Sequence, residues 1–139
     1  MTPHVYRCHV RFSDVDVYGH VNNVKYFEYY QEARIAFILA LSEGPYDADS
    51  SPSQVVARID VDYRRPILFR AEPYVIETWV TRVGTTSYDL SSRILDAAGE
   101  GGTEYSRADV RLVAYDLVAQ RPRPLTEVER SRLTGLSGG

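Results

Sequence analysis

Apolar residues follow two different spacings in the first third of the chain, which predict a strand and then a long helix. From Val5 to Phe12, apolar and polar residues alternate, which indicates a strand with one solvated side. Its apolar face consists of Tyr6, Cys8, Val10 and Phe12. From Val24 to Ser42, apolar residues recur at helical spacing and continue around much of the circumference. We therefore expect a helix that is buried on more than one side.

Four long strand patterns occupy most of the remaining chain. Gly44-Pro45 should end the long helix, and Tyr46 to Ser53 should form a loop. The strand patterns run from Gln54 to the break at Arg65-Pro66, from Tyr74 to Val83, from Ser87 to Asp96 and from Glu104 to Asp116. In the first of them, strict alternation would place on one face Val55, Ala57, Ile59, Val61 and Tyr63.

A short helix is expected near the end of the sequence. Gln120 to Pro124 is a basic, proline-rich segment, and Thr126 to Leu133 follows it with a helical pattern. Thr126 and Glu129 have the spacing of a capping box, in which each side chain binds the backbone N–H of the other residue.

The order of these elements predicts the fold class. Strands and helices do not alternate, so a doubly wound parallel sheet is not expected. One long helix against one curved antiparallel sheet is an α+β arrangement, and we expect a single domain over residues 1–139. Such a sheet leaves edges uncovered, and pairing of two copies would cover them. We therefore expect a homodimer or a homotetramer.

Composition excludes several classes of protein. The 139 residues are 44% hydrophobic and 25% charged, with a net charge of −3, which leaves no basic footprint for nucleic acid. No apolar run approaches the length of about 20 residues that spans a membrane, and the first residues lack the apolar core of a signal peptide. The lone cysteine, Cys8, excludes an intrachain disulfide and agrees with a cytoplasmic protein. The 11 tyrosines suit either strand surfaces or an aromatic-lined ligand tunnel.

The candidate chemistry lies between the first strand and the long helix. Ser13 to Asn23 contains two aspartates, a histidine, a glycine and two asparagines. The start of a helix carries unpaired N–H groups and partial positive charge. This junction could therefore stabilise an anion next to a carboxylate.

The run DVDVYGHVNNVKYFEYYQEAR, from Asp14 to Arg34, resembles the signature of the hotdog-fold acyl-CoA thioesterases. The likeness is to the 4-hydroxybenzoyl-CoA and long-chain acyl-CoA branch, and in order of elements it covers about residues 4–133. It implies a long central helix wrapped by a five-stranded antiparallel sheet. Plant acyl-ACP thioesterases have a similar string, but they place Asn at the position of Tyr18 and Gln at that of Gly19. This departure favours a CoA thioester over an acyl-ACP as the substrate.

The resemblance also implies roles for single residues. Asp16 matches the catalytic carboxylate, and Gly19 matches a glycine of the turn. The backbone at Gly19 and Asn23 would form the substrate and oxyanion site, in which the N–H near Asn23 polarises the thioester carbonyl. The supporting positions of the motif are Tyr18, His20, Asn22 and Tyr26.

The chemistry of these residue types leaves two routes open. Asp16 could act as a general base on water, or it could attack the thioester and form an anhydride. Asp14 is expected to fix the loop through hydrogen bonds to the backbone. Asp16 alone would also suit a turn or a cap, so a hotdog domain that binds acyl-CoA without turnover is the alternative, with an acyl-ACP thioesterase as a further one.

No cofactor or metal is expected, since His4, His9 and His20 show no ligand spacing. Cys8 lies on the apolar face of its strand and suits a core position. Arginines could hold the phosphates of CoA, and the candidates, among which the sequence does not choose, are Arg58, Arg64, Arg65 and Arg82.

Overall fold

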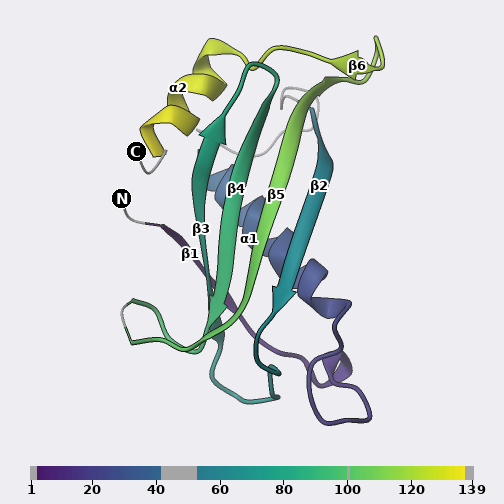
Figure 1. The fold of residues 1–139 in the computed structure, drawn as a ribbon, viewed down its shortest axis with the longest axis vertical. Coiled ribbons are helices and arrows are strands. Elements are labelled where there is room, and N and C mark those ends of the chain that lie inside the picture. The colour runs from purple at the N-terminus through teal and green to yellow at the C-terminus, as the bar shows by residue number, and fades with distance from the viewer. Residues whose placement is uncertain (1–2, 42–52, 100, 137–139) are drawn as a thin grey trace.

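One antiparallel sheet and two helices make up the described part of the chain (Figure 1). The structure is a computed structural model that describes residues 3–41, 53–99 and 101–136. The strands are β1 (His4–Cys8), β2 (Gln54–Tyr63), β3 (Tyr74–Val83), β4 (Ser87–Leu95), β5 (Glu104–Asp116) and β6 (Arg121–Pro122). The helices are α1 (Lys25–Leu41) and α2 (Glu127–Leu136), and a 3-10 turn, η1, spans Phe12–Asp14.

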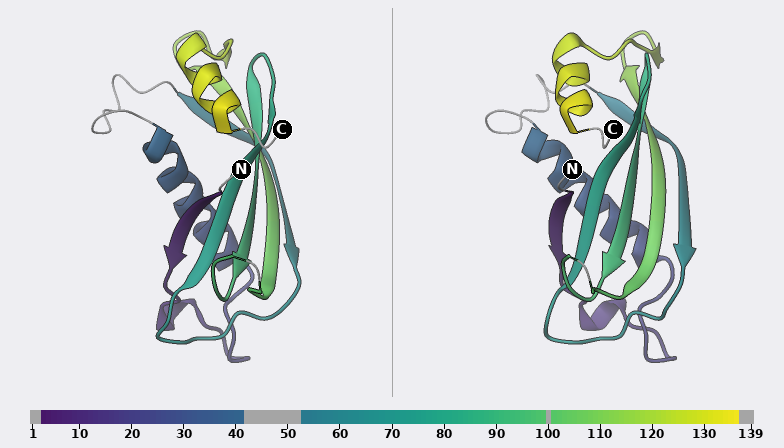
Figure 2. Two further views of the ribbon diagram at one scale, coloured as in Figure 1. Left: turned by 90° about the vertical axis from the view of Figure 1, so that its left-hand side faces the viewer. Right: turned by 60° about the vertical axis from the view of Figure 1, so that its left-hand side comes forward.

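The sheet runs in the order β1-β3-β4-β5-β2, and β6 pairs with β5. Figure 2 shows α1 lying along one face of this sheet, while α2 lies beside one end of it. The junction between β1 and α1 lies at the opposite end of the sheet from α2 (Figure 1). Neither helix in the described ranges combines the length and the apolar character that crossing a membrane requires.

Two details of the expected architecture were wrong. The sheet has six strands instead of five, because the chain turns back after β5. Asp116 Oδ1 accepts the N–H groups of Val118 and Ala119 in this turn, and β6 then pairs with the end of β5.

The expected long central helix was also wrong in length, since α1 is a short helix of 17 residues. It begins at Lys25 because Val24 still belongs to the capping turn, where its N–H binds the side chain of Asn22. The expected last residue, Ser42, lies outside the described residues, as do Gly44-Pro45 and the expected loop except for Ser53.

The first strand is shorter than the alternation predicted. β1 ends at Cys8, and the 3-10 turn begins at Phe12. The Asp14 N–H donates to Arg11 O in this turn, so the chain changes direction before Phe12. As a result Phe12 is 81% exposed, whereas Cys8 and Val10 are buried as expected.

A bulge in β2 breaks the expected alternation. The pairing with β5 shifts between Val56 and Arg58, so Ala57 has no partner. Val56 lies opposite Leu112, which is buried. Because directly opposed residues share a face, the bulge places Val56 on the helix side of the sheet and Val55, expected there, on the other side. After the bulge the expected face resumes, because buried residues of β5 lie opposite Ile59, Val61 and Tyr63.

The buried side chains form two clusters along α1. The cluster at the start of the helix includes Tyr26, Tyr29 and Tyr30, together with Ile67 from the β2–β3 connection and Ile76 from β3. The second cluster surrounds Phe37 and extends to α2. The first cluster lies directly behind the β1–α1 junction and therefore supports the candidate site.

Helix α2 begins with the capping box that the sequence predicted. The Thr126 N–H donates to Glu129 Oε1 at 2.8 Å, and the Glu129 N–H donates to Thr126 Oγ1 at 3.1 Å. Arg123 also binds the Glu129 carboxylate, with an Nη1–Oε1 distance of 2.9 Å. Glu129 is therefore held both by the local capping box and by Arg123, which lies outside the helix.

We expect Thr126→Ala to lower the free energy of unfolding by about 1 kcal/mol, because an N-terminal donor loses its acceptor. Urea denaturation measures this change. Thr134→Ala, an exposed position in the same helix, is the matched control and should change stability by less than about 0.5 kcal/mol. Equal effects of the two substitutions would contradict the capping role.

Candidate functional site

The β1–α1 junction is a small hairpin. Val15 and Val21 form an antiparallel bridge, and the Asp16 N–H donates to His20 O at 3.0 Å. The Gly19 N–H donates to Asp16 O at 3.1 Å and closes the turn. Gly19 has φ +85°, a conformation that strains residues with a Cβ atom. Gly19 therefore shapes the turn, and its own N–H is already used within it.

The carboxylate of Asp16 lies over this turn with one oxygen engaged. Oδ1 accepts the Tyr18 N–H at 2.9 Å. Oδ2 lies 3.8 Å from His20 Nδ1, which is too long for a hydrogen bond. Among the residues that the structure describes, no donor binds Oδ2. The Asp16 side chain is 23% exposed, so this oxygen can meet a small molecule such as water.

The other predicted residues of the turn differ in exposure. Tyr18 is 81% exposed, and its ring stacks on the His20 ring with centroids 6.1 Å apart. His20 is also bridged to Leu68 of the β2–β3 connection. The two stacked rings therefore form one wall beside Asp16.

The two asparagines mark the start of α1. Asn22 Oδ1 accepts the Val24 N–H at 3.0 Å, and Asn22 O accepts the Lys25 N–H at 2.9 Å. Asn22 is therefore the cap. Asn23 O accepts the hydroxyl of Tyr63 at 2.9 Å, but within the described ranges the Asn23 N–H has no acceptor. This N–H remains available at the positive end of the helix.

Tyr26 is a buried anchor of the site. It is 3% exposed, and its ring meets the Tyr63 ring edge to face at 4.7 Å. Its hydroxyl donates to Arg65 O and accepts the Ile67 N–H, at 3.4 and 3.3 Å. Burial raises the pKa of Tyr26, so the phenol keeps its proton. Tyr26 thus holds the β2–β3 connection against the helix.

Asp14 is enclosed beneath the hairpin. Its side chain has no exposed surface, and its carboxylate accepts the Tyr29 hydroxyl at 2.6 Å and the Arg11 N–H at 3.0 Å. The Arg11 guanidinium lies 3.2 Å from Oδ1. Burial alone would raise the pKa of Asp14, but these hydrogen bonds outweigh it and lower the pKa below its ordinary value. The bond to the Arg11 backbone agrees with the fixing role expected from the sequence.

Sequence reasoning missed Tyr29 and Tyr63. Tyr29 lies 15 residues from Asp14, and Tyr63 lies 40 residues from Asn23. No local pattern connects residues at such separations. The abundance of tyrosine was the available signal, because a buried phenol usually finds a hydrogen-bond partner.

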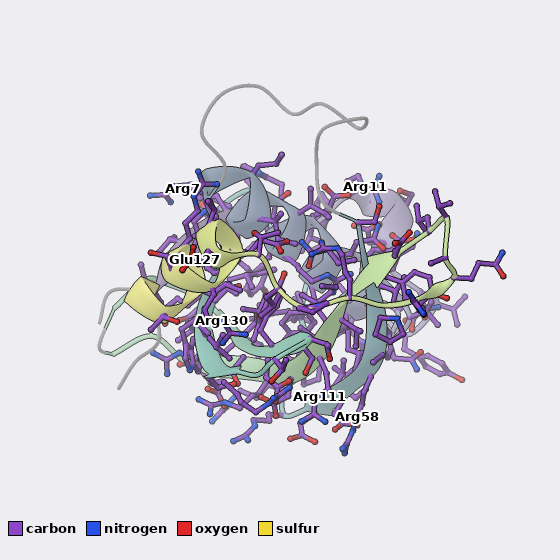
Figure 3. All side chains as sticks on the ribbon, turned by 90° about the horizontal axis from the view of Figure 1, so that it is seen from above. Arg7, Arg11, Arg58, Arg111, Glu127 and Arg130 are labelled. Atoms are coloured by element: carbon purple, nitrogen blue, oxygen red, sulfur yellow. The ribbon has the colours of Figure 1, made fainter. Side chains whose placement is uncertain are left out.

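The candidate arginines are mostly paired with carboxylates. These pairs are Arg58 with Asp60, Arg64 with Glu104, and Arg82 with Asp89, at 2.9, 3.2 and 3.0 Å. Asp89 also binds Arg111, and the hydrogen bonds from Arg111 and Arg82 lower the pKa of Asp89 to about 2. Arg58 and Arg111 project from the sheet on the side opposite α1 (Figure 3). Their charges are therefore balanced locally and give no reason to assign a phosphate site to them.

The described residues also contain no group of three or more His, Cys, Asp or Glu side chains that could hold a metal ion. Cys8 is a free, buried cysteine. Burial raises the pKa of its thiol to about 12, which suits the core position expected from the sequence.

Comparison with known proteins relates the whole arrangement to thioesterases. The family model of the thioesterase-like superfamily matches residues 10–133. A thioesterase from Thermus thermophilus, crystallised with coenzyme A and zinc, is 31% identical with a TM-score of 0.79, over 99% of this chain and 97% of that chain. A predicted thioesterase from Bacillus stearothermophilus has the same fold, with a TM-score of 0.83 at 21% identity, over 96% of this chain and 95% of that chain.

A curated relative comes from Bacillus subtilis (strain 168), the uncharacterized protein YsmA. It is 35% identical over 91 residues, which are 66% of this chain. The match spans only 56% of the length of that relative.

Proposed function

Because this chain belongs to the thioesterase-like superfamily, we propose that it is an acyl-CoA thioesterase, which hydrolyses a thioester to a free carboxylic acid and CoA. The family and the solved structures support thioester hydrolysis in general. The CoA carrier is supported by the 31% identical Thermus protein, which was crystallised with coenzyme A.

One observation carries the proposal. At the hairpin, Asp16 has a carboxylate oxygen without a donor among the described residues, and at the adjoining helix start Asn23 has an N–H without an acceptor. Thioester hydrolysis needs a group that activates water and a donor for the oxyanion. Asp16 supplies the first, and the Asn23 N–H supplies the second. Gly19 shapes the turn that holds them.

In the water route, Asp16 takes a proton from water as the water oxygen attacks the thioester carbon. The carbonyl oxygen gains negative charge and is stabilised by the Asn23 N–H and the helix start. The carbon–sulfur bond then breaks, and CoA leaves as a thiolate that needs no strong acid to protonate it. The proton held by Asp16 can pass to this thiolate.

In the nucleophilic route, a carboxylate oxygen of Asp16 attacks the same carbon, and the carbon–sulfur bond breaks to release the CoA thiolate. Water then hydrolyses the resulting anhydride, which frees the carboxylic acid and restores Asp16. Both routes use a carboxylate oxygen of Asp16 and the same oxyanion donor. Four further residues support both routes. The stacked rings of Tyr18 and His20 lie beside Asp16, Asn22 caps the helix, and Tyr26 holds the β2–β3 connection against it.

A panel of acyl thioesters tests the proposed function. The purified chain should release free thiol from acyl-CoAs of short, long, branched or aromatic acyl groups, and a thiol reagent measures the rate. Acyl-ACP is assayed in parallel, and faster cleavage of acyl-ACP would favour that carrier. Binding of acyl-CoA by calorimetry without thiol release would favour the binding domain that does not turn over its ligand.

We also propose that two copies pair through β2. This strand forms one edge of the sheet, and it exposes Val55, Val56 and Tyr63 at 38%, 45% and 46%. An uncovered edge strand of ten residues is a template for pairing with another chain. The result would be a homodimer, and two such dimers could form a homotetramer. The proposed setting is the cytoplasm, with residues 1–139 acting as one domain.

We expect Ala57→Pro to convert the dimer to a monomer in size-exclusion chromatography with light scattering. Ala57 lies at the bulge and has no register partner in β5, so proline there alters the free edge at a position where a strand tolerates it. Ala57→Ser keeps the N–H and serves as the control. A proline variant that stays dimeric would contradict pairing through β2.

A further inference from the structure

The strongest unexplained feature of the molecule is the buried cluster around Asp14, which the proposed chemistry does not use. Asp14 lies between the hairpin and the helix, and it makes contacts of two kinds. Its carboxylate binds Tyr29 of α1 and the Arg11 N–H before the hairpin. Its backbone oxygen accepts the Asn22 N–H at 2.9 Å. Asp14 thus links Arg11, before the hairpin, with Asn22 at the start of the helix, next to Asn23.

We propose that Asp14, fixed by the Tyr29 hydroxyl, is a positioning residue that aligns the Asp16 carboxylate with the Asn23 N–H. This inference rests on the proposed function, because the alignment matters for thioester hydrolysis.

The geometry gives Tyr29 a different effect from an ordinary core residue. Tyr29 is 5% exposed and belongs to the rigid helix. Its 2.6 Å bond to Asp14 Oδ2 ties the hairpin to that helix through a charged acceptor, and such bonds are stronger than neutral ones. Asp14 lies two residues before Asp16, so a small shift of Asp14 moves the turn. Misplacement of reacting groups by about 1 Å can lower a rate by about 100-fold.

The charged surroundings of Asp14 come from three elements. Arg11 precedes the hairpin, and Lys25 of α1 lies 4.0 Å from Oδ1. Glu28 of α1 binds both of these cations, 3.6 Å from Arg11 and 3.2 Å from Lys25. Cys8 of β1 faces the carboxylate with a raised pKa and stays neutral. Tyr29 is therefore the uncharged donor in this group.

These contacts predict a pH effect. The pKa of Asp14 is lowered in the folded protein, so its stabilising bonds are complete above the ordinary pKa of a free carboxyl and are lost as the pH falls through the folded value. Without the Tyr29 hydroxyl, one bond that lowers the pKa disappears, while burial continues to raise it. Asp14 should then take up a proton at a higher pH than in the unmodified chain.

The test is Tyr29→Phe, which removes one oxygen and keeps the ring. We expect kcat for acyl-CoA hydrolysis to fall about 10-fold with KM unchanged within about twofold, since alignment and not substrate binding is lost. The acid limb of the kcat–pH profile should move to higher pH. The matched control is Tyr30→Phe, because Tyr30 also has a buried hydroxyl, but this hydroxyl binds Ser106 Oγ of β5 at 2.7 Å and not a residue of the hairpin segment. It should leave both readouts unchanged.

A second variant and a second measurement make the test independent of folding and of catalysis. Arg11→Gln removes the guanidinium that binds Asp14. Because the Arg11 side chain is 65% exposed, this change should lower kcat, as Tyr29→Phe does, without disturbing the core. Amide hydrogen exchange at Asn22, measured by NMR, should be faster in Tyr29→Phe than in Tyr30→Phe.

The outcomes are distinguishable from failure of the proposed function. If the unmodified chain cleaves no thioester, the proposed function fails, and the exchange rate at Asn22 alone decides the positioning. Faster exchange then supports it, and unchanged exchange overturns it. In an active enzyme, Tyr29→Phe with an unchanged kcat overturns the inference, whatever its effect on exchange or melting temperature.

Discussion

Asp16→Asn is expected to lower kcat for acyl-CoA hydrolysis about 100- to 10,000-fold, the usual range for loss of a general base. The asparagine oxygen can still accept the Tyr18 N–H, which now binds Asp16 Oδ1 at 2.9 Å, so the turn should keep its shape. What disappears is the basic, nucleophilic oxygen. Thiol release from the preferred acyl-CoA, measured at saturating substrate, gives the size of the effect.

Glu127→Gln is the control for this experiment, because Glu127 is an exposed carboxylate on α2, at the opposite end of the sheet from the hairpin. Its rate should equal that of the unmodified protein. Circular dichroism and light scattering should show that Asp16→Asn has the same fold and assembly as the control. An Asp16→Asn protein with the full rate would exclude both the general-base and the nucleophilic route.

Ile67→Ala should lower the free energy of unfolding by about 2–5 kcal/mol, the cost of removing a fully buried isoleucine side chain. Ile67 belongs to a connection instead of a strand or helix, yet it has no exposed surface and packs in the cluster behind the hairpin. Its carbonyl also accepts the Val21 N–H at 2.8 Å. The substitution should therefore loosen the hairpin as well as the core.

The adjacent residue provides the control for this prediction. Leu68 is 55% exposed, and Leu68→Ala should cost less than about 1 kcal/mol, because a surface side chain leaves no cavity. Both variants are compared by urea denaturation. Equal losses at the two positions would mean that the cluster behind the hairpin does not carry the stability assigned to it.

The spacing of apolar residues was sufficient to predict most of the elements, because a helix and a half-buried strand have different periods. It failed where a local turn or a bulge interrupted the regular strand. Phe12 continues the alternation of β1 in the sequence but begins a 3-10 turn. At the bulge in β2, one extra residue puts Val55 and Ile59 on opposite faces of the sheet, and no residue type around Ala57 signals it.

The candidate site divides in the same way. Asp16 and Asn23 stand out in the sequence because they belong to one short motif at a helix start. Tyr29 does not, since its partner Asp14 lies 15 residues away and their contact depends on how the helix docks. Local sequence can therefore suggest which groups react, while the residues that hold them are found only in the folded chain.

Three tyrosine hydroxyls on α1 fix the position in which this helix packs against the sheet. Tyr26, Tyr29 and Tyr30 bond to three separate segments, at Arg65, Asp14 and Ser106. Apolar contacts are not directional, so a helix held by apolar side chains alone could shift along the sheet with little loss of stability. A shift by one turn, about 5.4 Å, would leave all three hydroxyls buried without a hydrogen-bond partner. Each lost bond would cost about 1–3 kcal/mol. The three tyrosine hydroxyls thus fix the position of α1 along the sheet. Replacing all three tyrosines with phenylalanine should keep the core apolar but allow the helix to dock in more than one position.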